Sequence, residues 1–157
     1  MTLAPFAVLG IGNILMRDDG AGVRAVELLQ TRGLPESVRL VDVGTTIYHT
    51  MGIFSESEKI IVLDCVKLGD KPGTVYQLNA SEFRARTPRK ASSHDIGVLE
   101  VLSLLSLSGQ KVPEVVIIGV QPLDYGSWGG DLSMEVSNAL PEMAEKAMAQ
   151  LKLWGAI

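Results

Sequence analysis

Three almost entirely apolar runs constrain the fold of this chain more than any other feature of its sequence. They lie at Phe6–Gly12, Lys59–Val66 and Val115–Val120. A strand with one face in water alternates apolar and polar residues, whereas a strand covered on both faces is apolar throughout, as in the centre of a parallel sheet. The three runs therefore predict buried strands of a mostly parallel sheet.

The segments between these runs have the patterns of helices and of less buried strands. Apolar residues at helical spacing predict helices, and a glycine just after such a pattern is typical of a helix end. Because strands and helices alternate along the chain, we predict an α/β protein, a three-layer α/β/α sandwich around a mostly parallel, twisted sheet. The predicted helices are Ala21–Arg32, Tyr48–Phe54, Asp95–Leu107 and Ser133–Leu153. The further predicted strands are Val38–Val43 and Thr74–Leu78, and the second of these is expected at an edge of the sheet. The segment Arg84–Ser93 is a predicted loop.

Length and composition limit the classes of protein to which this chain can belong. The 157 residues predict one domain, over residues 1–157, because no repeat, low-complexity tract or linker divides them. Hydrophobic residues make up 46% of the chain and charged residues 20%, as in globular rather than disordered proteins. The net charge of −4 gives no electrostatic footprint for nucleic acid, so no nucleic-acid partner is expected.

The cysteine content and the N-terminus indicate where the protein acts. The single cysteine, Cys65, cannot form a disulfide within the chain, which fits a reducing compartment. The run Phe6–Ile11 has no Lys or Arg before it and is too short to span a membrane, so neither a signal peptide nor a membrane segment is predicted. We therefore expect a cytoplasmic protein without a membrane partner, and we expect a monomer.

Polar residues suited to catalysis stand just after predicted strands or just before predicted helices. Asp19 follows the first strand, Asp64 ends the third strand, and His94 ends the loop before the helix Asp95–Leu107. In open α/β sheets, ligands bind beyond the carboxyl ends of the strands. Two carboxylates and an imidazole are therefore expected to converge at one edge of the sheet.

The carboxylates of Asp19 and Asp64 also have a purely structural interpretation. Asp18 and Asp19 precede a helix, where the helix dipole alone favours acidic residues. Because adjacent side chains diverge, we expect only one of these two to face the crevice. Asp64 interrupts an apolar strand at its end, where an aspartate can also cap the following loop.

The two histidines have different expected roles. Ser92 and Asp95 have the spacing of a capping box, which places His94 in the first turn of a helix. There the helix dipole disfavours the protonated imidazole, and the neutral form is the one that binds metals. A surface histidine beside a helix start is the structural alternative. We expect His49 to be structural or solvent-facing.

A dinucleotide site is one competing interpretation of the first strand and its loop. Gly10-Ile11-Gly12 after a strand, with Asp42 ending the next strand, is similar to part of a Rossmann fingerprint. However, Leu15 occupies the third glycine position, and Asp18 and Asp19 would repel a pyrophosphate at the helix start. The residues therefore disfavour NAD.

A cysteine hydrolase is the other competing interpretation, with Cys65 as nucleophile and His94 as its base. Side chains alternate along a strand, so if Asp64 faces the crevice, Cys65 points the other way. The sequence therefore predicts that Cys65 is a core residue.

Several short motifs, taken together, resemble those of one known family. They are Gly10–Leu15, Asp18–Gly22, Asp42–Thr45, Val62–Cys65, Ser93–Gly97 and Gly119–Pro122. In these motifs and in their order, the chain is similar to the hydrogenase maturation endopeptidases over nearly its whole length. One departure is Val43, where the family often has glycine.

The resemblance implies a fold, a substrate and a site. It implies a five-stranded α/β/α domain and three metal-contacting residues, matched here by Asp19, Asp64 and His94. It also implies an endopeptidase, of aspartic type, that removes the C-terminal extension of the large-subunit precursor of a nickel–iron hydrogenase after nickel insertion. The nickel would come with the precursor. Because a site with so few protein ligands holds metal weakly without its substrate, the resting enzyme is expected to be metal-free.

The sequence leaves two mechanisms and one non-enzymatic alternative open. Two carboxylates and one imidazole suit a divalent metal such as nickel or zinc and leave coordination positions unfilled. The metal could polarise the scissile carbonyl or activate a water, or a carboxylate could act as general base while the metal positions the peptide. Alternatively, the same residues could serve a nickel-sensing chaperone that binds the precursor without cutting it.

Overall fold

The computed structural model describes residues 4–87 and 93–157, and of residues 93–96 it describes the backbone alone. The described chain contains a five-stranded sheet with the strand order β2-β1-β3-β5-β4. Neighbouring strands are parallel except for β4, which runs antiparallel to β5 at one edge. The strands are β1 (Phe6–Ile11), β2 (Val38–Gly44), β3 (Lys59–Cys65), β4 (Val75–Asn79) and β5 (Glu114–Val120).

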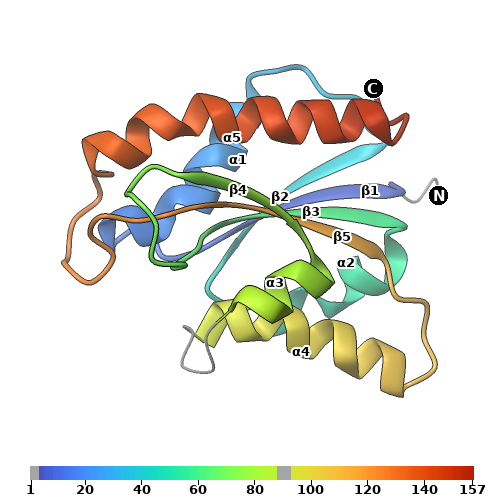
Figure 1. The fold of residues 1–157 in the computed structure, drawn as a ribbon. Helices are drawn as coiled ribbons and strands as arrows, with labels where there is room; N and C mark the ends of the chain where they lie inside the picture. Colours follow the sequence, from blue (N-terminus) through green and yellow to red (C-terminus); the bar gives the residue numbers. More distant parts are fainter. Residues whose placement is uncertain (1–3, 88–92) are drawn as a thin grey trace.

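Helices cover both faces of this sheet (Figure 1). Helices α1 and α5 lie on one face and α2, α3 and α4 on the other, which confirms the predicted three-layer α/β/α sandwich. The helices are α1 (Ala21–Gln30), α2 (Met51–Glu56), α3 (Ala80–Arg86), α4 (Ser93–Leu107) and α5 (Met134–Leu153), with the 3-10 turns η1 (Arg17–Gly20) and η2 (Ile47–Thr50).

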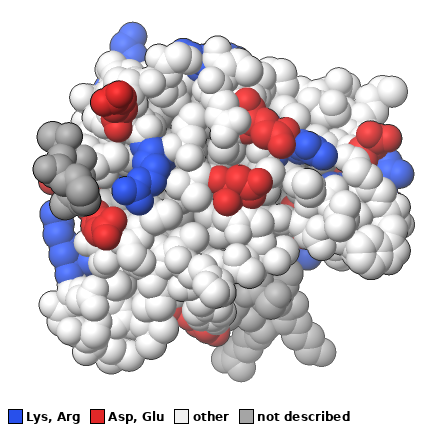
Figure 2. Space-filling model, turned by 180° about the vertical axis from the view of Figure 1, so that it is seen from behind, with Lys and Arg blue, Asp and Glu red and all other residues white. Residues whose placement is uncertain are grey.

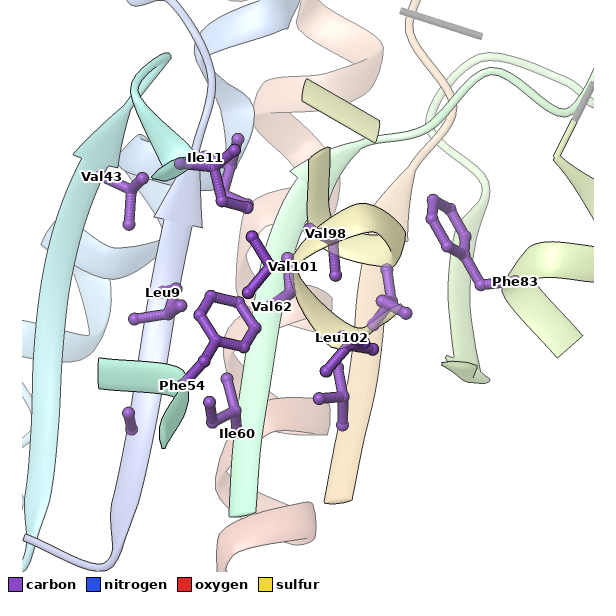
Figure 3. Packing of buried hydrophobic residues seen from close by; sticks show 14 of the residues in the cluster. Leu9, Ile11, Val43, Phe54, Ile60, Val62, Phe83, Val98, Val101 and Leu102 are labelled. Atoms are coloured by element: carbon purple, nitrogen blue, oxygen red, sulfur yellow. The ribbon is translucent and has the colours of Figure 1, made fainter. Parts of the chain in front are cut away.

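Alternation along the central strands divides the buried side chains into two cores. In β3, Ile60 and Val62 face the helices α2–α4, whereas Ile61 and Leu63 face α1 and α5. Figure 3 shows the first core, in which Phe54 from α2, Phe83 from α3 and several residues of α4 lie over the strands. Because β3 is buried on both faces, its continuous apolar run is explained.

The predicted elements are confirmed within a few residues, with one correction. The segment Arg84–Ser93 was predicted to be a loop, but residues 84–86 belong to α3. This helix begins with a capping box, in which Asn79 accepts a hydrogen bond from the Glu82 N–H and Glu82 accepts one from the Asn79 N–H. The pattern Asn79-x-x-Glu82 was thus the missed signal. Residues 88–92 of that segment lie outside the described residues.

The surface carries charges of both signs. Figure 2 shows acidic and basic side chains interspersed on the face seen from behind.

Among the described helices, none combines the length and the hydropathy that crossing a bilayer requires.

Candidate active site at the carboxyl edge of the sheet

Close backbone packing fixes the geometry of the first loop. A Cβ atom on Gly22 of α1 would lie 2.1 Å from the carbonyl oxygen of Leu63 and 2.5 Å from that of Ile11. Only glycine therefore allows the start of α1 to approach the ends of β1 and β3 this closely. As a result, η1 packs against β3, although the two are distant in sequence.

Asp19 lies in η1 and is buried at this edge of the sheet. The backbone N–H of Asn13, just after β1, donates a hydrogen bond of 3.0 Å to its Oδ2 atom. Gly12 makes room for this turn, because at its φ of +135° a Cβ atom would collide with the Asp19 carbonyl oxygen at 1.8 Å. The carboxylate is thus held at the end of β1, where the sequence predicted it.

Asp64 lies near the end of β3, opposite Gly119 of β5, and is 2% exposed. The backbone N–H of Cys65 donates a hydrogen bond of 2.7 Å to its Oδ1 atom. Alternation places Asp64 on the same face as Val62, toward the layer that contains α4. Cys65 has the opposite orientation and is buried in the core against α1 and α5, as predicted for a residue outside the crevice.

The backbone of His94 lies in the first turn of α4, as the sequence predicted. Figure 1 shows this start of α4 at the same end of the sheet as η1 and the end of β3. The His94 side chain and the proposed cap Ser92 lie outside the described residues. Among the described side chains, which do not include the His94 imidazole, no group of three or more His, Cys, Asp or Glu residues could hold a metal ion.

Asp18 has a different role from its neighbour. Its side chain is fully buried and accepts hydrogen bonds from the backbone N–H groups of Leu123, Asp124 and Ser133 and from the Ser133 hydroxyl, at 2.7–2.9 Å. Charge-assisted hydrogen bonds of this kind are stronger than neutral ones. Asp18 therefore fastens the β1–α1 loop to the β5–α5 loop, and the two adjacent aspartates diverge as expected.

Backbone contacts join the same two loops a second time. The N–H of Arg17 donates to the Gly129 carbonyl at 2.9 Å, and the N–H of Gly129 donates to the Leu15 carbonyl at 2.8 Å. Arg17 adopts the left-handed conformation, with a φ of 49°, which costs free energy in a residue with a side chain. The surrounding hydrogen bonds therefore hold a locally strained turn beside Asp19.

Gln121, just after β5, stands in one of the family motifs, but the sequence predicted no role for its side chain. Its side-chain oxygen accepts hydrogen bonds from the N–H groups of Leu68 and Gly69, at 2.8 and 3.1 Å. The Tyr76 hydroxyl lies 3.2 Å from this oxygen and 2.6 Å from the Asp70 carboxylate, and its single proton goes to the nearer carboxylate. Burial, helped by a hydrogen bond to Asp70, raises the pKa of Tyr76, so its hydroxyl stays protonated as a donor. Gln121 therefore positions the loop that follows Asp64.

Comparison with known proteins identifies the family. The family model for hydrogenase maturation proteases matches residues 23–150. The chain belongs to the hydrogenase maturation protease family. A curated relative, the hydrogenase expression/formation protein HupD of Rhizobium leguminosarum bv. viciae, is 38% identical over 150 residues, which cover 94% of this chain and 74% of the relative.

Solved structures of family members share the fold. The hydrogenase maturating endopeptidase HybD from Escherichia coli superposes with a TM-score of 0.88 at 32% identity, covering 96% of this chain and 93% of that one. The [NiFe] hydrogenase maturation protease HybD from Thermococcus kodakarensis gives a TM-score of 0.77 at 29% identity, covering 92% and 97%. Membership of this family confirms a peptidase with a five-stranded α/β fold.

The structure also disfavours the competing dinucleotide-binding interpretation. The geometry near the first loop does not resemble that of a dinucleotide site, because Asp18 and Asp19 are buried before α1, where a pyrophosphate would bind. Asp42, considered as a ribose ligand, accepts a hydrogen bond of 3.0 Å from the N–H of Gly44 in its own turn. Both observations agree with a hydrolase rather than an oxidoreductase.

Proposed function

We propose that this protease removes the C-terminal extension of the nickel-loaded large-subunit precursor of a nickel–iron hydrogenase. Family membership over residues 23–150 is the observation that carries this proposal. Asp19 and Asp64 support it, because two buried carboxylates from separate segments lie at the edge of the sheet where α/β proteins bind their ligands. His94, in the first turn of α4, would complete the site.

One of the two carboxylates would transfer the proton in peptide hydrolysis. The reaction joins a water oxygen to the scissile carbonyl carbon and breaks the bond from that carbon to the amide nitrogen, so a proton must pass from water to the leaving amine. A carboxylate of Asp19 or Asp64 would accept that proton and return it to the amine. The backbone N–H groups of Asn13 and Cys65 would keep the two carboxylates oriented.

Nickel belongs to the substrate in this proposal. Carboxylate oxygens and a neutral imidazole are suitable ligands for nickel, so Asp19, Asp64 and His94 would recognise the metal in the precursor. When bound, the metal would polarise the scissile carbonyl or the attacking water. We expect protein purified without added metal to contain less than about 0.1 nickel or zinc per chain by mass spectrometry, whereas stoichiometric, chelator-resistant zinc would contradict a substrate-supplied metal.

A cleavage assay with two forms of the precursor tests the proposal. Purified protein is mixed with nickel-loaded and with nickel-free precursor, and the precursor is followed by intact mass. We expect the nickel-loaded form to lose its C-terminal extension and the nickel-free form to stay intact. Binding without any loss of mass would instead identify a nickel-sensing chaperone.

We further propose that the protein works as a cytoplasmic monomer. The single, buried Cys65 is compatible with a reducing compartment. Sedimentation velocity at micromolar concentration should give the mass of one chain, and a dimer would contradict the proposed state.

A further inference from the structure

Large apolar side chains are exposed on the two loops that Asp18 joins. Leu15 in the β1–α1 loop and Leu123, Tyr125 and Trp128 in the β5–α5 loop are all exposed, and Trp128 is 77% exposed. We call these four residues the apolar rim. Single exposed apolar residues are ordinary, but several on adjoining segments indicate an interaction site.

The hydrogen bonds already described join the two loops that carry the apolar rim. The Gly129 N–H donates to the carbonyl of Leu15, which brings the segment next to Trp128 against the first loop. The N–H groups of Leu123 and Asp124 donate to the buried carboxylate of Asp18. Figure 1 shows both loops together at the carboxyl edge of the sheet. The four side chains therefore extend from a backbone that is fixed before any partner binds.

Further contacts stiffen the β5–α5 loop from within. The Asp124 carboxylate accepts hydrogen bonds from the N–H groups of Gly126 and Ser127, at 3.2 and 3.1 Å. The ammonium group of Lys67, which follows β3, lies 4.0 Å from the centre of the Tyr125 ring. A loop that is rigid yet keeps aromatic and aliphatic side chains in water loses little conformational entropy when a partner covers it.

We propose that the apolar rim docks an apolar segment of the hydrogenase precursor next to the scissile peptide, an inference that rests on the proposed function. The occupant follows from continuity, because the loop that carries Leu15 also carries Asp19. A peptide bond brought to Asp19 has to pass beside this loop and the one fastened to it. Trp and Tyr in the rim are the residue types that most often dominate protein interfaces.

Binding measurements with rim variants test this docking surface. The nickel-loaded precursor is titrated in the Asp64→Asn background, chosen to prevent cleavage, with and without Trp128→Ala or Leu15→Ser. We expect each rim substitution to weaken binding by about tenfold or more. Leu153→Ser is the matched control, because Leu153 is 80% exposed at the end of α5, near the opposite end of the sheet (Figure 1), and it should leave the affinity unchanged.

The outcomes separate this inference from the proposed function. Unchanged affinity in both rim variants would overturn the docking surface, even if the wild-type protein cleaves the precursor. Failure of the wild-type protein to cleave would overturn the proposed function, whereas rim-dependent binding would still support docking. A wild-type dimer that Trp128→Ala converts to a monomer would assign the rim to a second copy of the chain and overturn the inference.

Discussion

The two faces of the sheet differ in what the glycines of their helices contact. On one face, α1 approaches the ends of β1 and β3 until the Gly22 backbone contacts the Leu63 and Ile11 carbonyl groups. On the other face, a Cβ atom on Gly97 of α4 would meet the side chain of Ile47 at 2.5 Å. The helix that follows Asp18 and Asp19 thus meets the sheet through backbone contacts, whereas the helix that begins near His94 has its glycine against a side chain.

This difference indicates which part of the molecule holds its catalytic groups most accurately. Catalytic groups lose activity when they are displaced by as little as about 1 Å. Glycine contacts and the Asp18 hydrogen bonds hold the β1–α1 loop in place. The first prediction below compares the two faces, and the others concern this loop and the β5–α5 loop joined to it.

The largest effect is expected from Gly22→Ala. The new Cβ atom would overlap backbone carbonyl groups that cannot move without disturbing β1 and β3, so we expect a loss of about 3 kcal/mol or more in the free energy of unfolding. Urea denaturation followed by circular dichroism measures the change. The control is Gly52→Ala in α2, whose Cβ would meet only the Glu56 side chain at 3.9 Å, and it should stabilise by about 0.5 kcal/mol. Equal losses in both variants would remove the contrast between the faces.

The second effect is expected from Asp18→Ala. Removing the carboxylate leaves the buried N–H group of Ser133 and the partly buried N–H groups of Leu123 and Asp124 without this acceptor, which should cost about 2–3 kcal/mol. The control is Glu145→Ala, which removes an exposed ion pair with Arg32 and should cost less than about 0.5 kcal/mol. Chemical denaturation compares the two variants, and a similar small loss in both would mean that Asp18 does not fasten the loops.

The sequence was sufficient to predict the layers but not the strand order. Continuous apolar runs identify β1, β3 and β5 because burial on both faces leaves no polar positions. The order β2-β1-β3-β5-β4 depends on which edges pair in space, and no local pattern records that. Helix α3 was missed because its polar residues outweighed the short capping signal at Asn79.

The positions of the candidate site residues were predictable in part for similar reasons. Asp19 and Asp64 stand at strand ends, which a sequence reveals, and the structure has both carboxylates at the carboxyl edge of the sheet. The role of Asp18 was not predictable, because its partners Leu123 and Ser133 lie 105 and 115 residues away. The role of Gln121 was not predictable for the same reason, since its side-chain oxygen accepts hydrogen bonds from Leu68 and Gly69, 53 and 52 residues away.

A third, smaller effect is expected from Arg17→Gly. Glycine adopts a φ of 49° without the steric cost that a side chain imposes, so the substitution should stabilise the protein by about 0.5 kcal/mol. Arg24→Gly, within α1, is the matched control and should destabilise by about 1 kcal/mol. Thermal denaturation of both variants gives the sign of each change in stability. Destabilisation by Arg17→Gly would show that the turn is not strained.

The smallest effect is a pH response of the β5–α5 loop. Hydrogen bonds, first of all from the Ser127 N–H, lower the pKa of Asp124 below its ordinary value of 3.8. Because the folded-state pKa is depressed, the stabilisation is present above that ordinary value and is lost as the pH falls through the lowered pKa. The Ser127 amide resonance should therefore titrate with a midpoint below 3.8, and a midpoint above it would contradict the assigned hydrogen bonds.

The most direct test of the central proposal is a comparison of single-residue variants in the cleavage of nickel-loaded precursor. We expect Asp19→Asn, Asp64→Asn and His94→Ala each to lower the rate by about a thousandfold or more while the circular dichroism spectrum stays native. His49→Ala should cleave like the wild-type protein, because His49 is exposed in η2 and has no proposed role in the reaction. Near-normal cleavage by any of the first three variants would contradict the proposed site.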